Sequence, residues 1–179
     1  MSEHIETERL ILRKFKESDY QDVYEWGSDA RISKLMNFDT HKSVCESRDV
    51  IRDVLIPDGS YAIILRENQE CIGSIGFIYD IDHNKAELGY ALKHKYWKQG
   101  YMSETISSIL DYLFNTKHLN RVEAYIYTQN KASKKVLENC GFEIEGHLKQ
   151  FYYHKGTYKD CYLLAITSST YLQHKQIML

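Results

Sequence analysis

The chain has 179 residues, a formal net charge of -2 and 43% hydrophobic residues. This length suits one globular domain with a hydrophobic core, so we expect a single domain over residues 1–179. A near-neutral charge argues against a nucleic-acid partner, because a phosphate-binding face usually makes a domain basic.

Membrane, redox and metal signals are weak throughout the sequence. No run has the length and apolar character of a membrane span. The N-terminus has acidic residues where a signal peptide needs basic ones, and its apolar stretch is too short. We therefore expect a cytoplasmic protein with no membrane partner. The eight histidines form no H-x-x-x-H or H-E-x-x-H pattern, so no metal site is expected. Four scattered cysteines, without a C-x-x-C pair, predict reduced thiols at Cys45, Cys71, Cys140 and Cys161.

The first elements in chain order are one strand and two helices. Glu8–Phe15, "ERLILRKF", has the composition of a strand. Two helices are predicted at Ser18–Trp26 and Ser43–Ile56. Each opens with a serine three residues before Gln21 or Glu46, which is the spacing of a capping box.

Three strand-like runs follow, separated by the polar turns "ENQE" and "IDHNK". A meander of this kind is expected to be antiparallel. The runs are Tyr61–Glu67, Cys71–Asp80 and Lys85–Lys93.

The second half begins with an amphipathic helix over Met102–Phe114, whose apolar residues recur every three to four positions. A strand at Arg121–Thr128 comes next, then a helix at Asn130–Phe142 with Gly141 as its C-terminal stop. Two long strands, joined at Lys155–Gly156, complete the order. The strand–helix–strand unit predicts a parallel pair, so we expect a mixed α/β fold with helices on both faces of one sheet.

Gly100 directly precedes the Met102–Phe114 helix. Backbone N–H groups at a helix N-terminus lack intrahelical partners, so this junction can hold an anion. It can equally be an ordinary loop-to-helix turn.

The order and motifs resemble the GNAT superfamily of acetyl-CoA-dependent N-acetyltransferases, and within it the RimJ/RimL branch that modifies ribosomal protein N-termini. The resemblance runs from "TERLILR" to "GTYKDCYLLAI" and includes "ELGYAL…YWKQGYMSET" and "NKASKKVLENCGF…EGHLKQ". It implies a GNAT-type, mostly antiparallel sheet with a splayed central parallel strand pair, here Glu87–Lys93 and Arg121–Thr128.

The resemblance implies acetyl-CoA as the cosubstrate. Trp97 stands where the family's pyrophosphate loop usually has Gln or Arg, and Met102 stands where Gly or Ala is usual. Backbone ligands tolerate these changes. The implied pyrophosphate ligands are the backbone groups of Lys98, Gln99, Gly100, Tyr101, Met102 and Ser103. The implied contacts with the rest of the cofactor are backbone groups of Tyr90, Ala91 and Leu92, together with Asn130 and Ser133.

Two catalytic residues are implied, each with a plainer alternative. Glu87 corresponds to an acidic general base, or is a surface glutamate on a strand. Ser133 corresponds to a proton donor for the leaving thiolate, or is a helix-surface serine or only a cofactor contact. Leu137 occupies the position where many members carry a tyrosine acid, and it has no proton to give. Asp160 matches a family position without an assignable role.

The function implied is transfer of an acetyl group to a primary amine, first of all a ribosomal-type protein N-terminal α-amine. One alternative is a small amine such as a polyamine, aminoglycoside or amino acid. Another is a non-catalytic sensor that binds acyl-CoA. We expect the edge strands of the C-terminal hairpin to allow pairing in a homo-oligomer. Four aromatic residues are expected in the core, with an acceptor pocket as the alternative: Trp26, Tyr61, Phe77 and Tyr79.

Overall fold

The computed structural model describes residues 4–57 and 59–178. Its strands are β1 His4–Glu6, β2 Leu10–Lys14, β3 Tyr61–Leu65, β4 Cys71–Asp80, β5 Lys85–Leu92, β6 Arg121–Tyr127, β7 Glu143–His154 and β8 Thr157–Thr167. Its α-helices are α1 Tyr20–Gly27, α2 Ala30–Ser33, α3 Val44–Val50, α4 Tyr101–Asp111, α5 Lys131–Asn139 and α6 Ser168–Met178. Shorter helical segments are η1 Glu17–Asp19, η2 Ile51–Leu55, η3 His94–Tyr96 and η4 Tyr112–Thr116.

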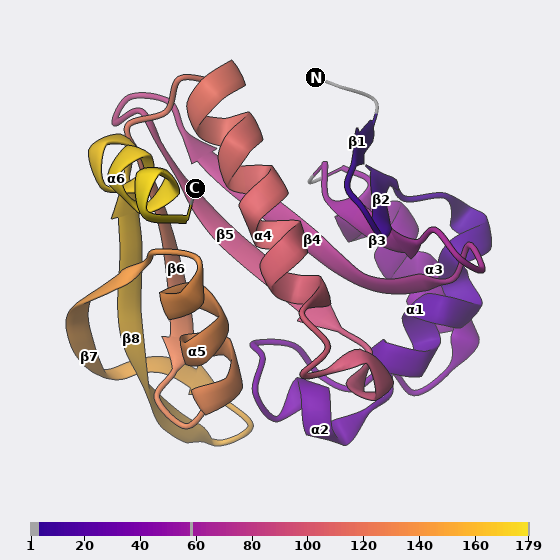
Figure 1. The fold of residues 1–179 in the computed structure, drawn as a ribbon. Helices are drawn as coiled ribbons and strands as arrows, with labels where there is room; N and C mark the ends of the chain where they lie inside the picture. Colours follow the sequence, from indigo (N-terminus) through magenta and orange to yellow (C-terminus); the bar gives the residue numbers. More distant parts are fainter. Residues whose placement is uncertain (1–3, 58, 179) are drawn as a thin grey trace. The chain divides into compact units, whose positions relative to one another are not determined.

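Within these residues the strands form an eight-stranded sheet in the order β1-β2-β3-β4-β5-β6-β8-β7 (Figure 1). β5 and β6 are parallel and are connected through α4. The pairs β1–β2, β2–β3, β3–β4, β6–β8 and β7–β8 are antiparallel. This confirms the mixed α/β fold with a mostly antiparallel sheet and one parallel pair.

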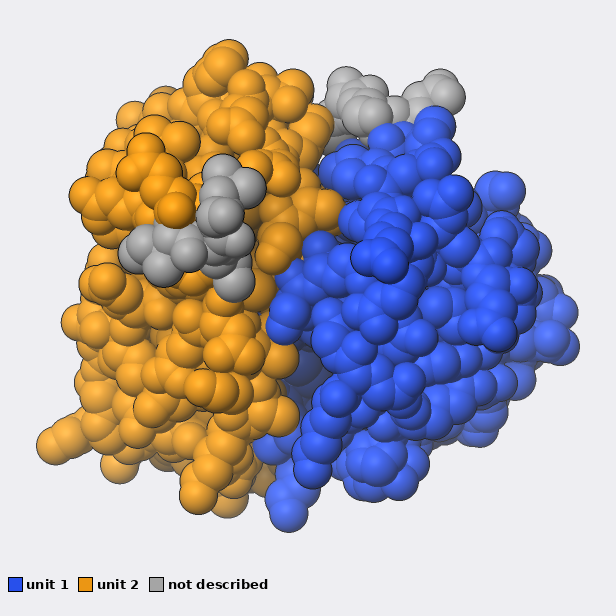
Figure 2. Space-filling view, viewed as in Figure 1, with its two compact units in different colours: residues 1–77, 89–105 blue, residues 78–88, 106–179 orange. Residues whose placement is uncertain are grey.

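The chain divides into two compact units (Figure 2). The first comprises residues 1–77 and 89–105, and the second comprises residues 78–88 and 106–179. Each unit has buried apolar side chains of its own.

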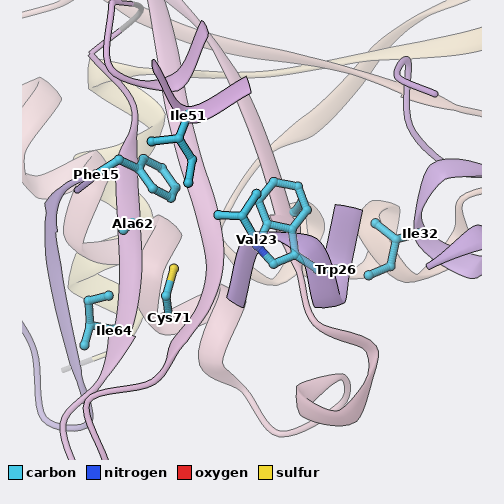
Figure 3. Close-up of a cluster of buried hydrophobic side chains, with 9 residues drawn as sticks. Phe15, Val23, Trp26, Ile32, Ile51, Ala62, Ile64 and Cys71 are labelled. Atoms are coloured by element: carbon cyan, nitrogen blue, oxygen red, sulfur yellow. The ribbon is translucent and has the colours of Figure 1, made fainter. Parts of the chain in front are cut away.

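The core of the first unit lies between its strands and the helices α1 and α3–η2 (Figure 3). Val23 and Trp26 of α1 and Ile51 of η2 pack with Phe15 and with residues of β3 and β4. Trp26 is therefore a core residue, as expected. Tyr61 is also buried, and Phe77 stacks on it with ring centroids 6.1 Å apart.

The second unit is built around β6, β8 and β7, with α5 and α6 alongside (Figure 1). β6 pairs with β8 from Arg121 opposite Thr167 to Tyr127 opposite Cys161. Tyr171 of α6 stacks on Phe114, with ring centroids 4.8 Å apart. Apolar side chains thus fasten α6 to the helical segment that follows α4.

One of the two predicted capping boxes is wrong. α1 begins at Tyr20, so Ser18 lies in the preceding turn η1 and caps nothing. Asp19 organises this turn instead, because its carboxylate accepts the Lys16 amide at 2.8 Å and both Arg13 guanidinium nitrogens at 2.8 Å. A partly buried ion pair therefore overrides the local serine signal. The second predicted cap is confirmed, since the Glu46 amide donates to Ser43 Oγ at 3.2 Å.

Other differences concern short or weakly patterned elements. The predicted strand Glu8–Phe15 is shorter, Leu10–Lys14, and the separate strand β1 pairs with it. α2 and α6 were not predicted. α2 has only four residues, and α6 has no clear apolar stripe in its sequence.

Candidate active site

The predicted pyrophosphate loop lies in the first unit and leads into α4. Lys98 and Gly100 both have left-handed backbone angles, with φ of 60° and 82°. The first helical hydrogen bond runs from the Glu104 amide to the Gly100 carbonyl at 3.0 Å. The amides of Tyr101 and Met102 precede this bond, so they have no acceptor within the helix. The loop therefore has the backbone geometry that an anion site needs.

Arg9 braces this loop, and the sequence analysis did not identify it. Its Nη1 donates to the Gln99 carbonyl at 3.0 Å, and its guanidinium lies 4.3 Å from the centroid of the Tyr101 ring. Its Nε donates to Glu104 at 2.7 Å, and its backbone amide donates to the same carboxylate at 2.9 Å. A Cβ on Gly100 would lie 3.3 Å from Arg9 Nη2. The guanidinium thus places a positive charge directly beside the loop glycine.

Glu104 balances that charge within the first turn of α4. Burial raises the pKa of Glu104, but hydrogen bonds from the Thr7 hydroxyl, the Arg9 amide and the Arg9 side chain outweigh it and leave the pKa lowered. Glu104 is therefore a fixed carboxylate that holds Arg9 in place. The only sequence signal for this pair is the "TERL" segment, which does not reveal its partner.

The end of β5 carries the predicted backbone ligands Tyr90, Ala91 and Leu92. The Leu92 carbonyl accepts a hydrogen bond from the Trp97 indole nitrogen at 2.8 Å. Trp97, which replaces the family's usual Gln or Arg, therefore ties the start of the loop to the end of the strand. The Ala91 carbonyl lies over Gly73 of β4, where a Cβ would collide with it. These contacts hold the end of β5 against β4 and against Trp97, which directly precedes the loop.

Lys93 anchors the residue after β5 in a cluster of carboxylates. The Lys93 side chain is 3% exposed, and its ammonium lies 2.8 Å from Asp22, 3.0 Å from Glu25 and 2.7 Å from Glu70. Burial lowers the pKa of Lys93, but the three carboxylates outweigh it and the pKa is raised. The same three carboxylates are near enough to share a metal ion, but the Lys93 ammonium occupies the space among them.

Glu87 lies in the second unit and faces a second glutamate. In the parallel register of β5 and β6, Glu87 is opposite Glu123. Glu123 is fixed by Lys85 Nζ and Arg121 Nε, each 2.8 Å from one of its oxygens. Among the described residues Glu87 has no hydrogen bond or ion pair of its own, and it is half-buried. Burial, followed by the charge of Glu123, raises the pKa of Glu87. Such a carboxylate suits a general base.

Asn130 and Ser133 begin α5, also in the second unit. The Ser133 amide donates to Asn130 Oδ1 at 3.1 Å, which confirms Asn130 as the N-cap. Both residues are buried, as is Leu137 one turn further along. Gly141, with φ of 89°, ends the helical segment as predicted. Leu137 packs in the core, so the tyrosine position of the wider family is structural here.

The described helices include none long and apolar enough to cross a bilayer.

A family model described as "Acetyltransferase (GNAT) domain" matches residues 9–143. An uncharacterized N-acetyltransferase p20 from Bacillus licheniformis is 34% identical over 94% of this chain and 98% of its own length. A crystal structure of a GNAT-family acetyltransferase from Bacillus anthracis superposes with a TM-score of 0.86 and 28% identity, covering 93% of this chain and 99% of that one.

Two relatives with named substrates point in different directions. A Vibrio cholerae spermidine N(1)-acetyltransferase is 21% identical over 94% of this chain and 98% of its own length. An Escherichia coli [ribosomal protein uS5]-alanine N-acetyltransferase is 33% identical, but over only 45% of this chain and 42% of its own length. The matches therefore agree on the reaction and differ on the acceptor.

Proposed function

Because the chain belongs to the GNAT family of acetyltransferases, we propose that it acetylates the α-amine at the N-terminus of a protein. As a family member it is an N-acetyltransferase that uses acetyl-CoA as cosubstrate. The observation that carries the proposal is the half-buried Glu87, whose raised pKa suits it to accept a proton from an amine.

The loop at Lys98–Ser103 fits the pyrophosphate of acetyl-CoA. Gly100 leaves the backbone open to a large anion, and Arg9 adds a positive charge beside it. We assign the pyrophosphate to these backbone amides, with Arg9 as the group that holds the loop. Backbone groups of Tyr90 and Ala91 are the proposed partners of the pantetheine arm.

The protein side chains assigned to the reaction mainly accept and donate protons. Acetyl-CoA supplies an acetyl thioester. Glu87 takes the proton that the acceptor nitrogen must lose, directly or through one water. As the nitrogen–carbon bond forms and the carbon–sulfur bond breaks, the electron pair leaves with the sulfur. The Ser133 hydroxyl or water then returns a proton to the thiolate.

Two features favour a protein α-amine over a polyamine. An α-amine has a pKa of about 7.7–8.0, whereas a lysine-like amine has a pKa of about 10.4, so a carboxylate deprotonates the α-amine with a smaller free-energy deficit. A polyamine also needs several carboxylates for its additional charges. Glu123 and Glu145 are already paired with Arg121, and Glu123 is paired with Lys85 as well.

Spermidine acetylation is the second candidate, because the spermidine relative spans nearly the whole chain. A thiol-release assay separates the two. Acetyl-CoA is supplied with a panel of N-terminal peptides, polyamines and aminoglycosides, and kcat/KM is compared. We expect peptides with a free α-amine to be turned over and the same peptides to be inert after chemical N-acetylation. If the protein acetylates spermidine but none of the peptides, the proposed acceptor is contradicted.

A further inference from the structure

The strand β7 contains a bulge to which the proposed reaction gives no role. Leu148 pairs with Cys161 and Tyr152 pairs with Lys159, so residues 149–151 lie opposite Asp160 alone. Gln150 at the centre of the bulge has a left-handed φ of 52°. This backbone conformation is unfavourable for a non-glycine residue, so surrounding contacts must hold it.

Asp160 is the residue that holds the bulge. One of its carboxylate oxygens accepts the Gln150 amide at 2.8 Å, and the other lies 2.9 Å from His147 Nε2. The Gln150 amide, followed by His147, lowers the pKa of Asp160, so the carboxylate stays charged near neutral pH. A residue without an assignable role in the sequence therefore has a definite structural task.

The bulge turns two consecutive aromatic residues toward β6. Regular alternation would send Phe151 and Tyr152 to opposite faces of the sheet. Instead, Phe151 stacks on Tyr125, with ring centroids 5.3 Å apart and an interplanar angle of 8°. Tyr152 meets Tyr127 edge-on at 6.0 Å. Phe151 remains 46% exposed, so its ring is available to a ligand.

These rings lie on the same side of the sheet as Glu87. Glu87 is opposite Glu123, and Tyr125 is two residues further along β6, so the three side chains share one face. Burial, followed by the charge of Glu123 and then that of Glu87, raises the pKa of Tyr125. Burial, followed by the charge of Glu87, raises the pKa of Tyr152 to about 12. Both phenols therefore stay neutral, and their electron-rich rings lie within reach of the carboxylate's field.

We propose that the bulge at residues 149–151 builds an aromatic acceptor subsite beside Glu87, made of Tyr125, Phe151 and Tyr152. The subsite takes a primary ammonium through the ring faces and the carboxylate, and takes the uncharged group attached to the ammonium against Phe151. Asp160 is its positioning residue. This inference rests on the proposed acetylation of an amine and specifies where that amine binds.

The charges around the subsite favour a cation over an anion. The neighbouring carboxylate Glu123 is neutralised by Lys85 and Arg121, and the Arg121 guanidinium also binds Glu145 at 2.6 Å. Glu87 is thus the carboxylate on this face whose charge is not balanced by an ion pair among the described residues. A peptide with a neutral first side chain fits better than one that begins with Asp or Glu, because a second carboxylate would be repelled.

The test compares Phe151→Ala with Tyr153→Ala. Tyr153 is the matched control, because it lies on the same strand, is 66% exposed and packs against Tyr158 rather than β6. The probe is an alanine-initiated peptide titrated by calorimetry into protein saturated with CoA. We expect Phe151→Ala to weaken peptide binding about 3–10-fold and Tyr153→Ala to change it less than about twofold. CoA affinity should stay at the wild-type value in both variants.

Asp160 is tested by a pair of substitutions. Asp160→Ala removes both hydrogen bonds and should weaken peptide binding as Phe151→Ala does, with a loss of the near-ultraviolet circular dichroism of the tyrosines. Asp160→Asn keeps an acceptor for the Gln150 amide and should restore most of the affinity. A merely stabilising residue would lower the melting temperature without this recovery of peptide affinity.

Failure of the subsite and failure of the proposed function give different results. If wild-type protein turns over spermidine and no peptide, the acceptor assignment falls, and the same variants are then titrated with spermidine. An equal effect of Phe151→Ala and Tyr153→Ala, or no effect of Phe151→Ala, on whichever amine is accepted would overturn the subsite.

Discussion

Glu87 faces Glu123 across the parallel strands β5 and β6, and among the described residues Glu123 is the one of the two that forms ion pairs. Lys85 and Arg121 hold Glu123 as a carboxylate, so its charge acts on Glu87 at every pH near neutrality. Together with burial, this raises the pKa of Glu87. The facing glutamate thus tunes the pKa of the proposed base.

The pH dependence of turnover should follow from this pair. A base must be deprotonated to act, so the rate of the chemical step should fall as the pH drops through the raised pKa of Glu87. Glu123→Gln removes the negative neighbour and also takes from Lys85, whose positive charge lowers the pKa of Glu87, its nearest carboxylate partner. Both changes lower the pKa of Glu87, so the acid limb of the single-turnover pH–rate curve should move to lower pH.

Glu145→Gln is the control for that shift. Glu145 shares Arg121 with Glu123 but is not among the groups that perturb Glu87. Its substitution should leave the acid limb in place. A limb that moves equally in both variants would show that the shift arises from Arg121 and not from the facing glutamate.

Gly100→Val should weaken the binding of CoA to the folded protein at least about tenfold, or about 1.4 kcal/mol. Its φ of 82° is unfavourable for a β-branched residue, and the added side chain would approach Arg9 and cover the loop amides. Gly156→Val is the matched control, since Gly156 has a φ of 75° and no atom within 4 Å of a Cβ position. It should lose stability through the same strain and retain CoA affinity, as measured by calorimetry. Unchanged affinity in folded Gly100→Val would remove the loop from the cofactor site.

Ser133→Ala should slow the chemical step more than it weakens cofactor binding. The serine is buried at the start of α5 beside the Asn130 cap. Leu137→Met, one turn further along, conserves volume and should cost less than about 1.5 kcal/mol with little kinetic effect. Single-turnover rates and CoA titrations on both variants distinguish a proton donor at Ser133 from a residue that only contacts the cofactor. Loss of affinity alone in Ser133→Ala would make the serine a cofactor contact.

The Lys93 cluster should make stability depend on acid pH. Burial raises the pKa of Glu70, but hydrogen bonds from Lys93, Lys95 and Tyr96 outweigh it and lower the pKa to about 2. A carboxyl with a lowered folded-state pKa contributes stability above its unfolded value, and that contribution is lost as the pH falls toward 2. Glu70→Gln should cost about 1.5–3 kcal/mol at pH 7 and flatten the decline in melting temperature below about pH 4.5. Glu67 is an exposed carboxylate in the turn just before Glu70, and Glu67→Gln should change neither the stability at pH 7 nor the decline in melting temperature at acid pH.

Much of the fold could be predicted because its signals are local. β4 matches its predicted bounds, and α5 begins after the Asn130 cap and ends before Gly141, because strand composition, caps and left-handed stops are written in adjacent residues. The parallel β5–β6 pair followed from chain order alone.

The remaining features depend on contacts that are distant in sequence. Arg9 reaches Glu104 across 95 positions, and Lys93 reaches Asp22 across 71, so no local pattern marks either pair. The bulge held by Asp160 breaks the strand alternation that sequence reasoning assumes. α6 is held by packing such as that of Tyr171 on Phe114, which its own weak pattern does not reveal.

The most direct test of the account is single-turnover acetyl transfer by Glu87→Gln. Glutamine keeps the shape of the side chain and cannot accept the proton. With an α-amine peptide as acceptor, the rate should fall about 10²–10⁴-fold, the acid limb of the pH–rate curve should disappear, and CoA affinity should be unchanged. A rate near that of the wild type, with the same acid limb, would contradict Glu87 as the base.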